Sequence, residues 1–464
     1  MGNGGLTQRL QTIMRNPTPL FSAVISGDLD RQRNEIQRAT MTFDCSEKLA
    51  LHGGPQAKRT PFPKRKRHGD LEKRYLAEVI DSDMLFFFSG TKVYEFQRRF
   101  AEMYGKKHCI ACSSGTAAVH IALATLQLPP GSEVITSAIT DMGSLTGLLY
   151  QGLVPVFADV SPETLNMEPA SVRRCLTEKT RAILIVHHSG LAADMGSFLD
   201  LGREFNLPIV EDCAQAYGCK YNGRLAGTMG VISAFSLNHF KHITCGSGGM
   251  VLTDDDRLRY LASLFLDKCY QREEKVRNPF FLAPNYQMTE LQGAVALAQL
   301  ERVVDIAESR NRLGRKLTQL LEQIPGVSPQ TVPPDFQHSY FLYLFKLDLE
   351  KLHCTTREFA TALAAEGVPN EAHQITGGRP TYLYDIFKKR SAFPGSNYPF
   401  GSRVYSEGDC PVAEDAFERW ITMNFYEHYT DRDVEEIAFG IAKVAYNFAA
   451  RPNWKKPSSV ERTV

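Results

Sequence analysis

The sequence predicts an α/β fold, with a mostly parallel sheet covered by helices on both faces and a smaller α+β domain after it. The first observation is a run of short apolar, β-branched segments, each followed by a helical stretch such as 168–176 or 195–205. The strand-like segments cover residues 133–136, 155–160, 182–187 and 208–212. This alternation is typical of βαβ units, which build parallel sheets with helices on both faces. The second observation is that the chain from about residue 325 alternates a strand-like segment with two helical ones, which suits a smaller α+β domain.

The elements can be followed along the chain. Residues 1–48 have a thin apolar stripe, so we expect an N-terminal extension that is partly disordered or packed on a partner subunit. Helical spacing appears between residues 69 and 104. The βα alternation follows and ends in strands 233–237 and 249–253. These elements define a large domain at 49–324.

The end of the large domain carries a helix-start signal. Thr289 with Gln292 forms a capping-box pattern, and apolar residues at helical spacing beyond it predict a long helix leaving this domain. The small domain, residues 325–464, is expected to hold a strand at 340–347 and helices at 356–366 and 431–448. Between them, residues 377–410 are rich in Gly, Pro, Tyr and Ser and predict a long functional loop.

Composition excludes several classes of protein. Hydrophobic residues make up 43% and charged residues 23% of the 464, which is ordinary for a globular protein. With 53 basic and 52 acidic side chains, no bulk attraction to nucleic acid or membrane is expected. Ten cysteines are scattered without a framework spacing, and neither a secretory signal nor a long apolar span is present. We therefore expect a cytoplasmic protein.

Lys241 is the most informative single residue. It lies between the strand-like run 233–237 and a glycine-rich turn that leads into the next strand, among apolar and small residues. Lysines usually decorate solvated surfaces, whereas a desolvated lysine can act as a neutral, nucleophilic amine that forms a Schiff base. An ordinary loop lysine is the alternative.

Two other segments favour the chemical interpretation. The apolar run 208–212 ends in carboxylates, so Asp212 is expected at the carboxyl end of a buried strand, where open α/β sheets bind ligands. Residues 109–120 read as a strand, a small-residue turn and a helix start, which is a site for a phosphate group. A phosphate cradle, a strand-end carboxylate and a buried lysine together indicate a pyridoxal 5'-phosphate site.

At these segments the chain resembles the DegT/DnrJ/EryC1/StrS family of sugar and cyclitol aminotransferases. The resemblance covers roughly residues 49–447, from the Leu-Ala-Leu-His-Gly-Gly-Pro segment at 49–55 through the Asn-Tyr-Gln-Met-Thr-Glu-Leu-Gln segment at 285–292. It implies the type I aminotransferase fold and transfer of an amino group from glutamate or glutamine to a keto-sugar, keto-cyclitol or related metabolite. Lys241 then anchors the cofactor and shuttles protons, and Asp212 contacts the pyridine nitrogen.

The same resemblance implies the other cofactor contacts. Gln215 would contact the 3-oxygen of the cofactor, and Gly115, Thr116 and Ser236 would hold its phosphate. Asn285 would reach the phosphate of a neighbouring subunit, which implies a homodimer with active sites at the interface. Each of these polar residues could instead cap a local turn.

The chain departs from the family pattern beside the cofactor ring. Where many members have an aromatic residue, this chain has Thr140-Asp141-Met142, so Met142 could cover the ring instead. Substrate contacts are assigned to Asp141, His187, His188 and the 377–410 loop. Arg379 or Arg403 of that loop could bind a diphosphate.

Other interpretations stay open. A related sugar dehydratase group carries histidine in place of the anchoring lysine, and Lys241 argues against that reaction. A non-catalytic homologue is a third alternative. Cys109 and Cys112 form a C-x-x-C without a second ligand pair, so no metal site is predicted. The basic run 64–67 is interpreted as a solvated charge run.

Overall fold

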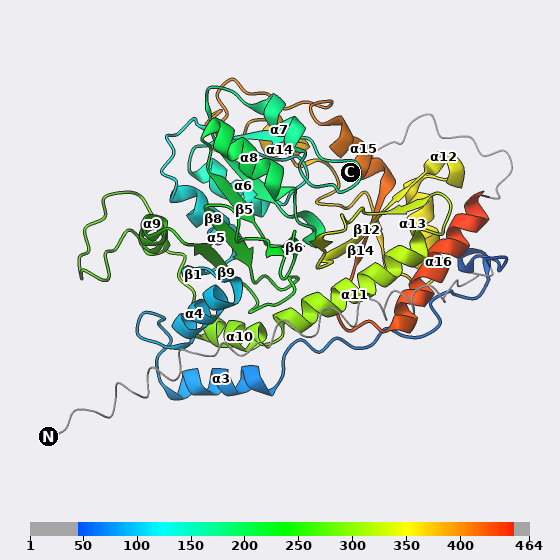
Figure 1. Cartoon of the computed structure of the whole chain (residues 1–464), viewed down its shortest axis with the longest axis horizontal. Helices are drawn as coiled ribbons and strands as arrows, with labels where there is room; N and C mark the ends of the chain where they lie inside the picture. Colours follow the sequence, from blue (N-terminus) through cyan, green and yellow to red (C-terminus); the bar gives the residue numbers. More distant parts are fainter. Residues whose placement is uncertain (1–44, 450–464) are drawn as a thin grey trace, which may run out of the picture. The chain divides into compact units, whose positions relative to one another are not determined.

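The computed structural model describes residues 45–449, and these belong to one compact unit (Figure 1). Residues 1–44 of the predicted extension lie outside the described residues, as do residues 450–464. The chain enters the described part beside the C-terminal helix, because the Asn447 side chain donates hydrogen bonds to the carbonyls of Cys45 and Glu47, over 3.4 and 3.3 Å.

A seven-stranded sheet forms the centre of the larger half, in the order β1-β9-β8-β5-β4-β2-β3. Its strands are β1 (His108–Cys112), β2 (Glu133–Ser137), β3 (Val154–Ala158), β4 (Thr180–Val186), β5 (Ile209–Asp212), β8 (Ile232–Ser236) and β9 (Gly249–Thr253). Only β9 runs antiparallel to its neighbours in this sheet, and all other neighbouring strands are parallel. The predicted mostly parallel sheet is confirmed.

Helices cover both faces of this sheet because its strands bury alternate residues on opposite sides. On one face Val134, Leu184 and Val210 pack with residues of α5 (Gly115–Ala124) and α6 (Met142–Tyr150). On the other face, Ile135, Ile183 and Ile209 pack with residues of α7 (Pro169–Cys175) and α8 (Met195–Phe205). The α/β fold class follows from this layering.

The long helix predicted beyond Thr289 is two helices. The capping box forms, with Thr289 and Gln292 bonding each other's backbone amides, and α10 (Glu290–Leu300) follows. The helical path ends at Glu301 and resumes as α11 (Val303–Leu321). At the break, the Arg302 side chain bonds the Arg67 carbonyl at 2.6 Å and pairs with Glu72. The prediction of one continuous helix was wrong because these tertiary contacts engage the residue at the junction.

The C-terminal part holds a second, antiparallel sheet in the order β10-β12-β14-β13. Its elements are β10 (Val327–Pro329), β12 (Leu342–Leu347), α12 (Leu349–Leu352), α13 (Thr356–Ala365), β13 (Glu371–Ala372), α15 (Pro411–Arg419), β14 (Trp420–Asn424) and α16 (Asp431–Ala449). The 377–410 loop contains two short helices, η3 (Thr381–Leu383) and α14 (Asp385–Lys388). A small sheet of β6 (Lys220–Tyr221), β7 (Arg224–Leu225) and β11 (Phe336–Gln337) joins the two parts. The domain boundary at residue 325 stays a prediction.

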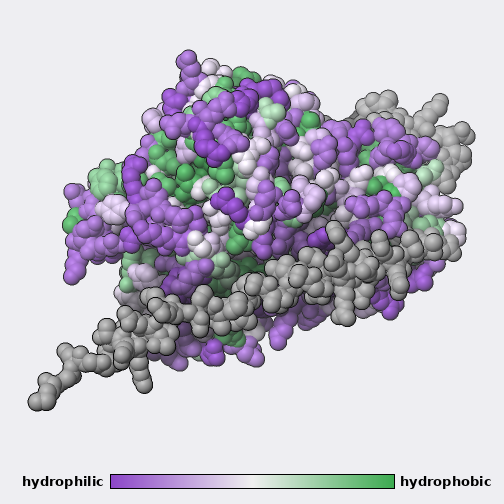
Figure 2. Space-filling model, in the orientation of Figure 1, coloured by the Kyte–Doolittle hydropathy of each residue, from purple (hydrophilic) through white to green (hydrophobic). Residues whose placement is uncertain are grey.

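The face of the described part seen in Figure 2 is mainly hydrophilic. Figure 2 shows hydrophilic side chains over most of the visible face, with hydrophobic ones in scattered patches. Within residues 45–449, none of the helices is both long and apolar enough to span a lipid bilayer.

A buried carboxylate joins α4 (Lys92–Tyr104) to α10, and α3 (Asp70–Asp81) packs against α10. The Glu290 carboxylate of α10 accepts hydrogen bonds from the amides of Thr91, Lys92 and Val93, over 2.9, 2.7 and 3.0 Å. Helix α4 has no side-chain cap of its own. Glu290 therefore satisfies the amides that begin α4.

Replacing Glu290 by glutamine is expected to lower the free energy of unfolding by about 2–4 kcal/mol, since it leaves buried backbone donors unpaired. Urea unfolding followed by circular dichroism measures this. Glu301→Gln is the matched control, because its pair with Arg99 is partly exposed and is worth at most about 1 kcal/mol. An equal loss in both variants would contradict the capping role.

Candidate active site

Asp212 lies at the carboxyl edge of the central sheet. It is the last residue of β5 and pairs in register with Val186, the last residue of β4. Its buried carboxylate accepts hydrogen bonds from the Ser144 hydroxyl at 2.7 Å and the Ala214 amide at 3.0 Å. Burial raises the pKa of Asp212, while these two donors and the Lys241 amine act in the opposite direction. Such a carboxylate is suited to stabilise a cation placed against it.

Lys241 lies in the bend between β8 and β9. Its amine is 4.4 Å from the centre of the Phe341 ring. Burial lowers the pKa of Lys241, and the carboxylates of Asp212 and Asp141 partly oppose that shift. Because a lower pKa increases the neutral, nucleophilic fraction, this environment suits covalent chemistry at the amine.

The predicted phosphate cradle is formed by the start of α5 and the end of β8. The Ser114 hydroxyl caps the helix by accepting from the Ala117 amide at 3.0 Å. The amides of Gly115 and Thr116 come first in the helix, where no intrahelical carbonyl is available to them. A Cβ on Gly115 would lie 2.4 Å from the Ser236 Cβ. Only glycine lets the helix start approach Ser236 so closely, and this cradle fits a phosphate.

Gln215 lies against the turn that follows β4. Its Oε1 accepts a hydrogen bond from the Ser189 amide at 2.7 Å. Ser189 has φ = 57° and Gly190 has φ = 96°, so this turn is held in the left-handed region. Among the described residues, the Gln215 amide nitrogen donates to no protein acceptor, which leaves it available to a ligand.

The structure brings several predicted substrate residues to the same edge. Asp141 caps α6 through the Gly143 amide at 2.7 Å, and Met142 is the first residue of that helix. The 377–410 loop contacts this turn, since Thr381 donates its amide to the Ala138 carbonyl at 2.9 Å. Arg379 of that loop is half-buried and has no ion pair within residues 45–449.

Two predicted pocket residues lie elsewhere. The His187 ring is fully buried between Glu211, 3.0 Å from Nε2, and the Ala193 amide, which donates to Nδ1 at 3.1 Å. Glu211 precedes Asp212 in β5, so it points to the opposite face of the sheet. Arg403 pairs at 2.9 Å with Glu133, at the amino end of β2. The pocket-lining interpretation of His187 and the diphosphate interpretation of Arg403 were therefore wrong.

Asn285 is exposed in the loop before α10, and its side chain accepts only a long bond from the Gln287 amide, at 3.4 Å. A side chain placed there is free to contact another molecule. Its predicted contact with a partner subunit stays a prediction.

Three residues near the site were not singled out from the sequence. Ser144 bonds Asp212, and its one signal is a hydroxyl in a mainly apolar helix. The Lys241 amine lies over the Phe341 ring, and no pattern in the sequence around Phe341 indicates this contact. Arg67 donates to the carbonyls of His239 and Lys241, the latter at 2.6 Å. Burial and, to a smaller extent, repulsion from Arg65 lower the pKa of Arg67 to about 10.

The basic run 64–67 is therefore only half solvated. Lys64 and Lys66 are exposed, but Arg65 forms a largely buried pair with Glu427 at 2.9 Å. The interpretation of the whole run as a solvated charge run was wrong for Arg65 and Arg67, because alternate residues of an extended segment face the protein.

One group of possible metal ligands is present in the described part of the chain. Donor atoms of His187, Glu211 and Cys213 lie within 4.8 Å of one another. Glu211 already accepts amide hydrogen bonds from Gly227, Met229 and Gly230, and His187 is fully bonded. These contacts indicate a structural role.

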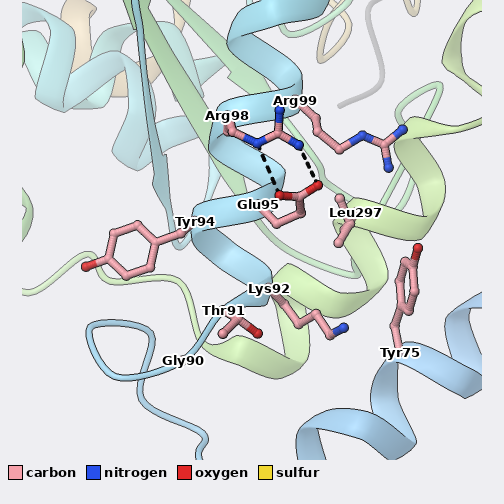
Figure 3. Close-up of a pocket in the computed structure, with 9 residues that line it drawn as sticks. All are labelled: Tyr75, Gly90, Thr91, Lys92, Tyr94, Glu95, Arg98, Arg99 and Leu297. Atoms are coloured by element: carbon pink, nitrogen blue, oxygen red, sulfur yellow. Dashed lines mark hydrogen bonds and ion pairs between the residues drawn. The ribbon is translucent and has the colours of Figure 1, made fainter. Parts of the chain in front are cut away.

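A cavity of about 490 Å³ opens between α3, α4 and α10, away from these residues (Figure 3). Its arginines are already paired, Arg98 with Glu95 and Arg99 with Glu301. It therefore lacks the features of the edge that holds Lys241.

Comparisons with known proteins show which family the chain that forms this edge belongs to. The model of the DegT/DnrJ/EryC1/StrS aminotransferase family matches residues 66–442. The chain belongs to this family. It is 31% identical over 379 residues to the spore coat polysaccharide biosynthesis protein SpsC of Bacillus subtilis, covering 80% of this chain and 93% of that protein. It is 33% identical over 333 residues to the L-glutamine:scyllo-inosose aminotransferase of Streptomyces griseus, covering 68% and 78% of the two chains.

A solved aminotransferase from Psychrobacter cryohalolentis superposes with a TM-score of 0.75 at 26% identity, covering 84% of this chain and all of that one. This DegT/DnrJ/EryC1/StrS member is thus a pyridoxal-phosphate-dependent aminotransferase with the type I fold. The residues at the carboxyl edge fit the cofactor, because they supply an anion cradle, a buried carboxylate and a desolvated amine in one place.

Proposed function

We propose that this aminotransferase moves an amino group from glutamine or glutamate to the carbonyl of a keto-sugar, keto-cyclitol or related metabolite, in a biosynthetic pathway. The observation that carries the proposal is a half-buried Lys241, whose pKa is lowered by desolvation, near the buried Asp212 carboxylate at the ligand edge of the sheet. The name of the Streptomyces griseus relative supports glutamine as donor and a cyclitol as acceptor.

Each residue has a proposed role. Lys241 would hold the cofactor covalently, and its amine, when free, would move a proton between carbon atoms of the reacting pair. Asp212 stabilises the protonated ring nitrogen, and Ser144 orients Asp212. When bound, pyridoxal phosphate supplies the electron sink for the carbanion that proton removal creates. Gln215 holds the ring oxygen.

The remaining contacts concern the phosphate and the substrate. Gly115, Thr116 and Ser236 bind the phosphate, and Met142 covers one side of the ring. Asp141 and Arg379 face the substrate. Arg379 has no carboxylate partner in the described chain, so an anionic group of the substrate would suit it.

The proposal includes a homodimer in which Asn285 contacts the partner's phosphate. The exposed position of Asn285 supports it, as do Phe280 and Leu282 of the same loop, which are 60% and 95% exposed. A cytoplasmic location is also proposed, because the buried cysteines Cys112, Cys213, Cys219, Cys269 and Cys410 are free thiols.

The function is tested by the cofactor and by a substrate screen. Purified protein is expected to be yellow, and borohydride should fix the cofactor to the peptide that contains Lys241, as mass spectrometry will show. Amino donors are then screened by the change in cofactor absorbance. A panel of keto acceptors is tested next. Protein that stays colourless with added cofactor would refute the enzyme assignment.

The dimer is tested by complementation. Lys241→Ala and Asn285→Ala should each be nearly inactive alone, whereas a re-equilibrated mixture should regain roughly a quarter of wild-type activity, because half of its dimers hold one intact site. Mixing with Asn206→Ala, a surface asparagine at the end of α8, is the control for dilution effects. Lack of recovery despite proven subunit exchange would contradict a shared site.

A further inference from the structure

His188 is a buried histidine without a hydrogen-bond partner. Its side chain lies in the turn after β4 and is 1% exposed, and neither ring nitrogen has a partner among the described residues. The backbone around it is well held, because the His188 amide donates to the Asn166 side chain at 3.0 Å and the Ser189 amide donates to Gln215 at 2.7 Å. Since buried polar groups are nearly always satisfied, the ring indicates a missing ligand.

The turn that carries His188 lies against the lysine. The Phe341 amide donates to the Ser189 carbonyl at 2.8 Å, and the Phe341 ring contacts the Lys241 amine at 4.4 Å. Gln215 binds the same turn through its oxygen, which directs its amide nitrogen elsewhere. His188 and Gln215 therefore border one region, next to Lys241.

The other charged and titratable groups around this region already have partners or belong to the site. His242 contacts the Ser339 carbonyl at 3.0 Å, and His338 contacts Gln330 at 3.0 Å and the Tyr340 amide at 2.8 Å. Asp141, Asp212 and Lys241 complete the set. His188 alone among these histidines has both ring nitrogens unpartnered in the described chain.

We propose that His188 is a positioning residue that donates a hydrogen bond to the ring oxygen of the cofactor, beside Gln215. This inference rests on the proposed roles of Lys241 and Gln215. Burial and, to a smaller extent, repulsion from Lys241 lower the pKa of His188 to about 4. The ring is therefore neutral near pH 7 and offers one N–H donor. A neutral donor stabilises an anionic oxygen without adding a second cation beside Lys241.

This contact has a measurable consequence for the nitrogen that links Lys241 to the cofactor. When that nitrogen is protonated, its proton neutralises the ring oxygen, and when it is deprotonated the oxygen keeps its full negative charge. A donor on the oxygen therefore favours the deprotonated form. His188 should lower the pKa of the linking nitrogen.

The test is an absorbance titration of the holoenzyme. His188→Leu is expected to raise the pKa of the linking nitrogen by about one pH unit or more, and His188→Asn, which keeps a donor, should largely restore it. His52→Leu, at an exposed histidine, should leave it unchanged. Circular dichroism and the cofactor content of each variant show whether the fold is kept.

Three results would overturn the inference. An unshifted pKa in His188→Leu excludes the contact, and an unshifted pKa with a raised KM for donor or acceptor assigns His188 to the substrate instead. Failure of the proposed function looks different, because wild-type protein then has no lysine-dependent absorbance band to titrate, and that result also overturns the inference.

Discussion

Replacing Lys241 by alanine is expected to lower kcat for amino transfer by at least about 10³-fold. The variant loses the amine that binds the cofactor covalently and the group that moves the proton, and general acid–base catalysis alone is worth about 10²–10⁴-fold. Borohydride should no longer attach the cofactor to the protein. Steady-state kinetics with the best donor and acceptor, together with mass spectrometry after reduction, measure both effects.

The fold of this variant should be intact, because the Lys241 side chain makes no ion pair within residues 45–449 and the Arg67 contact is to its carbonyl. Lys179→Ala, at an exposed lysine, is the control and should keep full activity. A Lys241→Ala enzyme with wild-type turnover would show that the assigned chemistry is wrong. A variant that fails to fold would be seen by circular dichroism, and Lys241→Arg then provides a second test.

Replacing Asp212 by asparagine is expected to lower kcat by about 10²–10⁴-fold, a range typical of a lost electrostatic or acid–base partner. Asparagine is nearly the same shape and can still bond Ser144, but it cannot stabilise a protonated ring nitrogen. The cofactor-free variant should be at least as stable as wild type at neutral pH. Burial raises the pKa of Asp212, so its ionised form destabilises the folded protein, and this penalty disappears as the pH falls.

Glu211→Gln is the matched control from the same strand. Burial opposes ionisation of Glu211, but hydrogen bonds from His187 and backbone amides outweigh it and lower its pKa. Its contribution to stability is therefore present at neutral pH and lost as the pH falls below about 4.5. Urea unfolding should show a loss of about 3–5 kcal/mol for Glu211→Gln. If Asp212→Asn were destabilised to the same extent with near-normal kcat, the proposed role of Asp212 would be wrong.

Local patterns predicted the central sheet well. Strand-like runs at 133–136, 208–212 and 249–253 appear as β2, β5 and β9 with nearly the same bounds, since each is a short apolar run ended by turn residues. The Thr289 capping box also forms as predicted. The continuous helix beyond it does not, because Arg302 is held by Glu72 and Arg67, from more than two hundred positions earlier in the chain.

Lys241 and Asp212 were singled out by the sequence alone, through a cation placed among packing residues and a carboxylate at the end of an apolar strand. Parallel strand order implies that such residues meet at one edge. Only the tertiary structure decided the surroundings. Strand register turns Glu211 and His187 away from Asp212, and packing from distant segments brings Ser144, Phe341 and Arg67 to the site. The physical reason is that local sequence sets periodicity, whereas the face of a side chain and its partners depend on contacts between segments far apart in the chain.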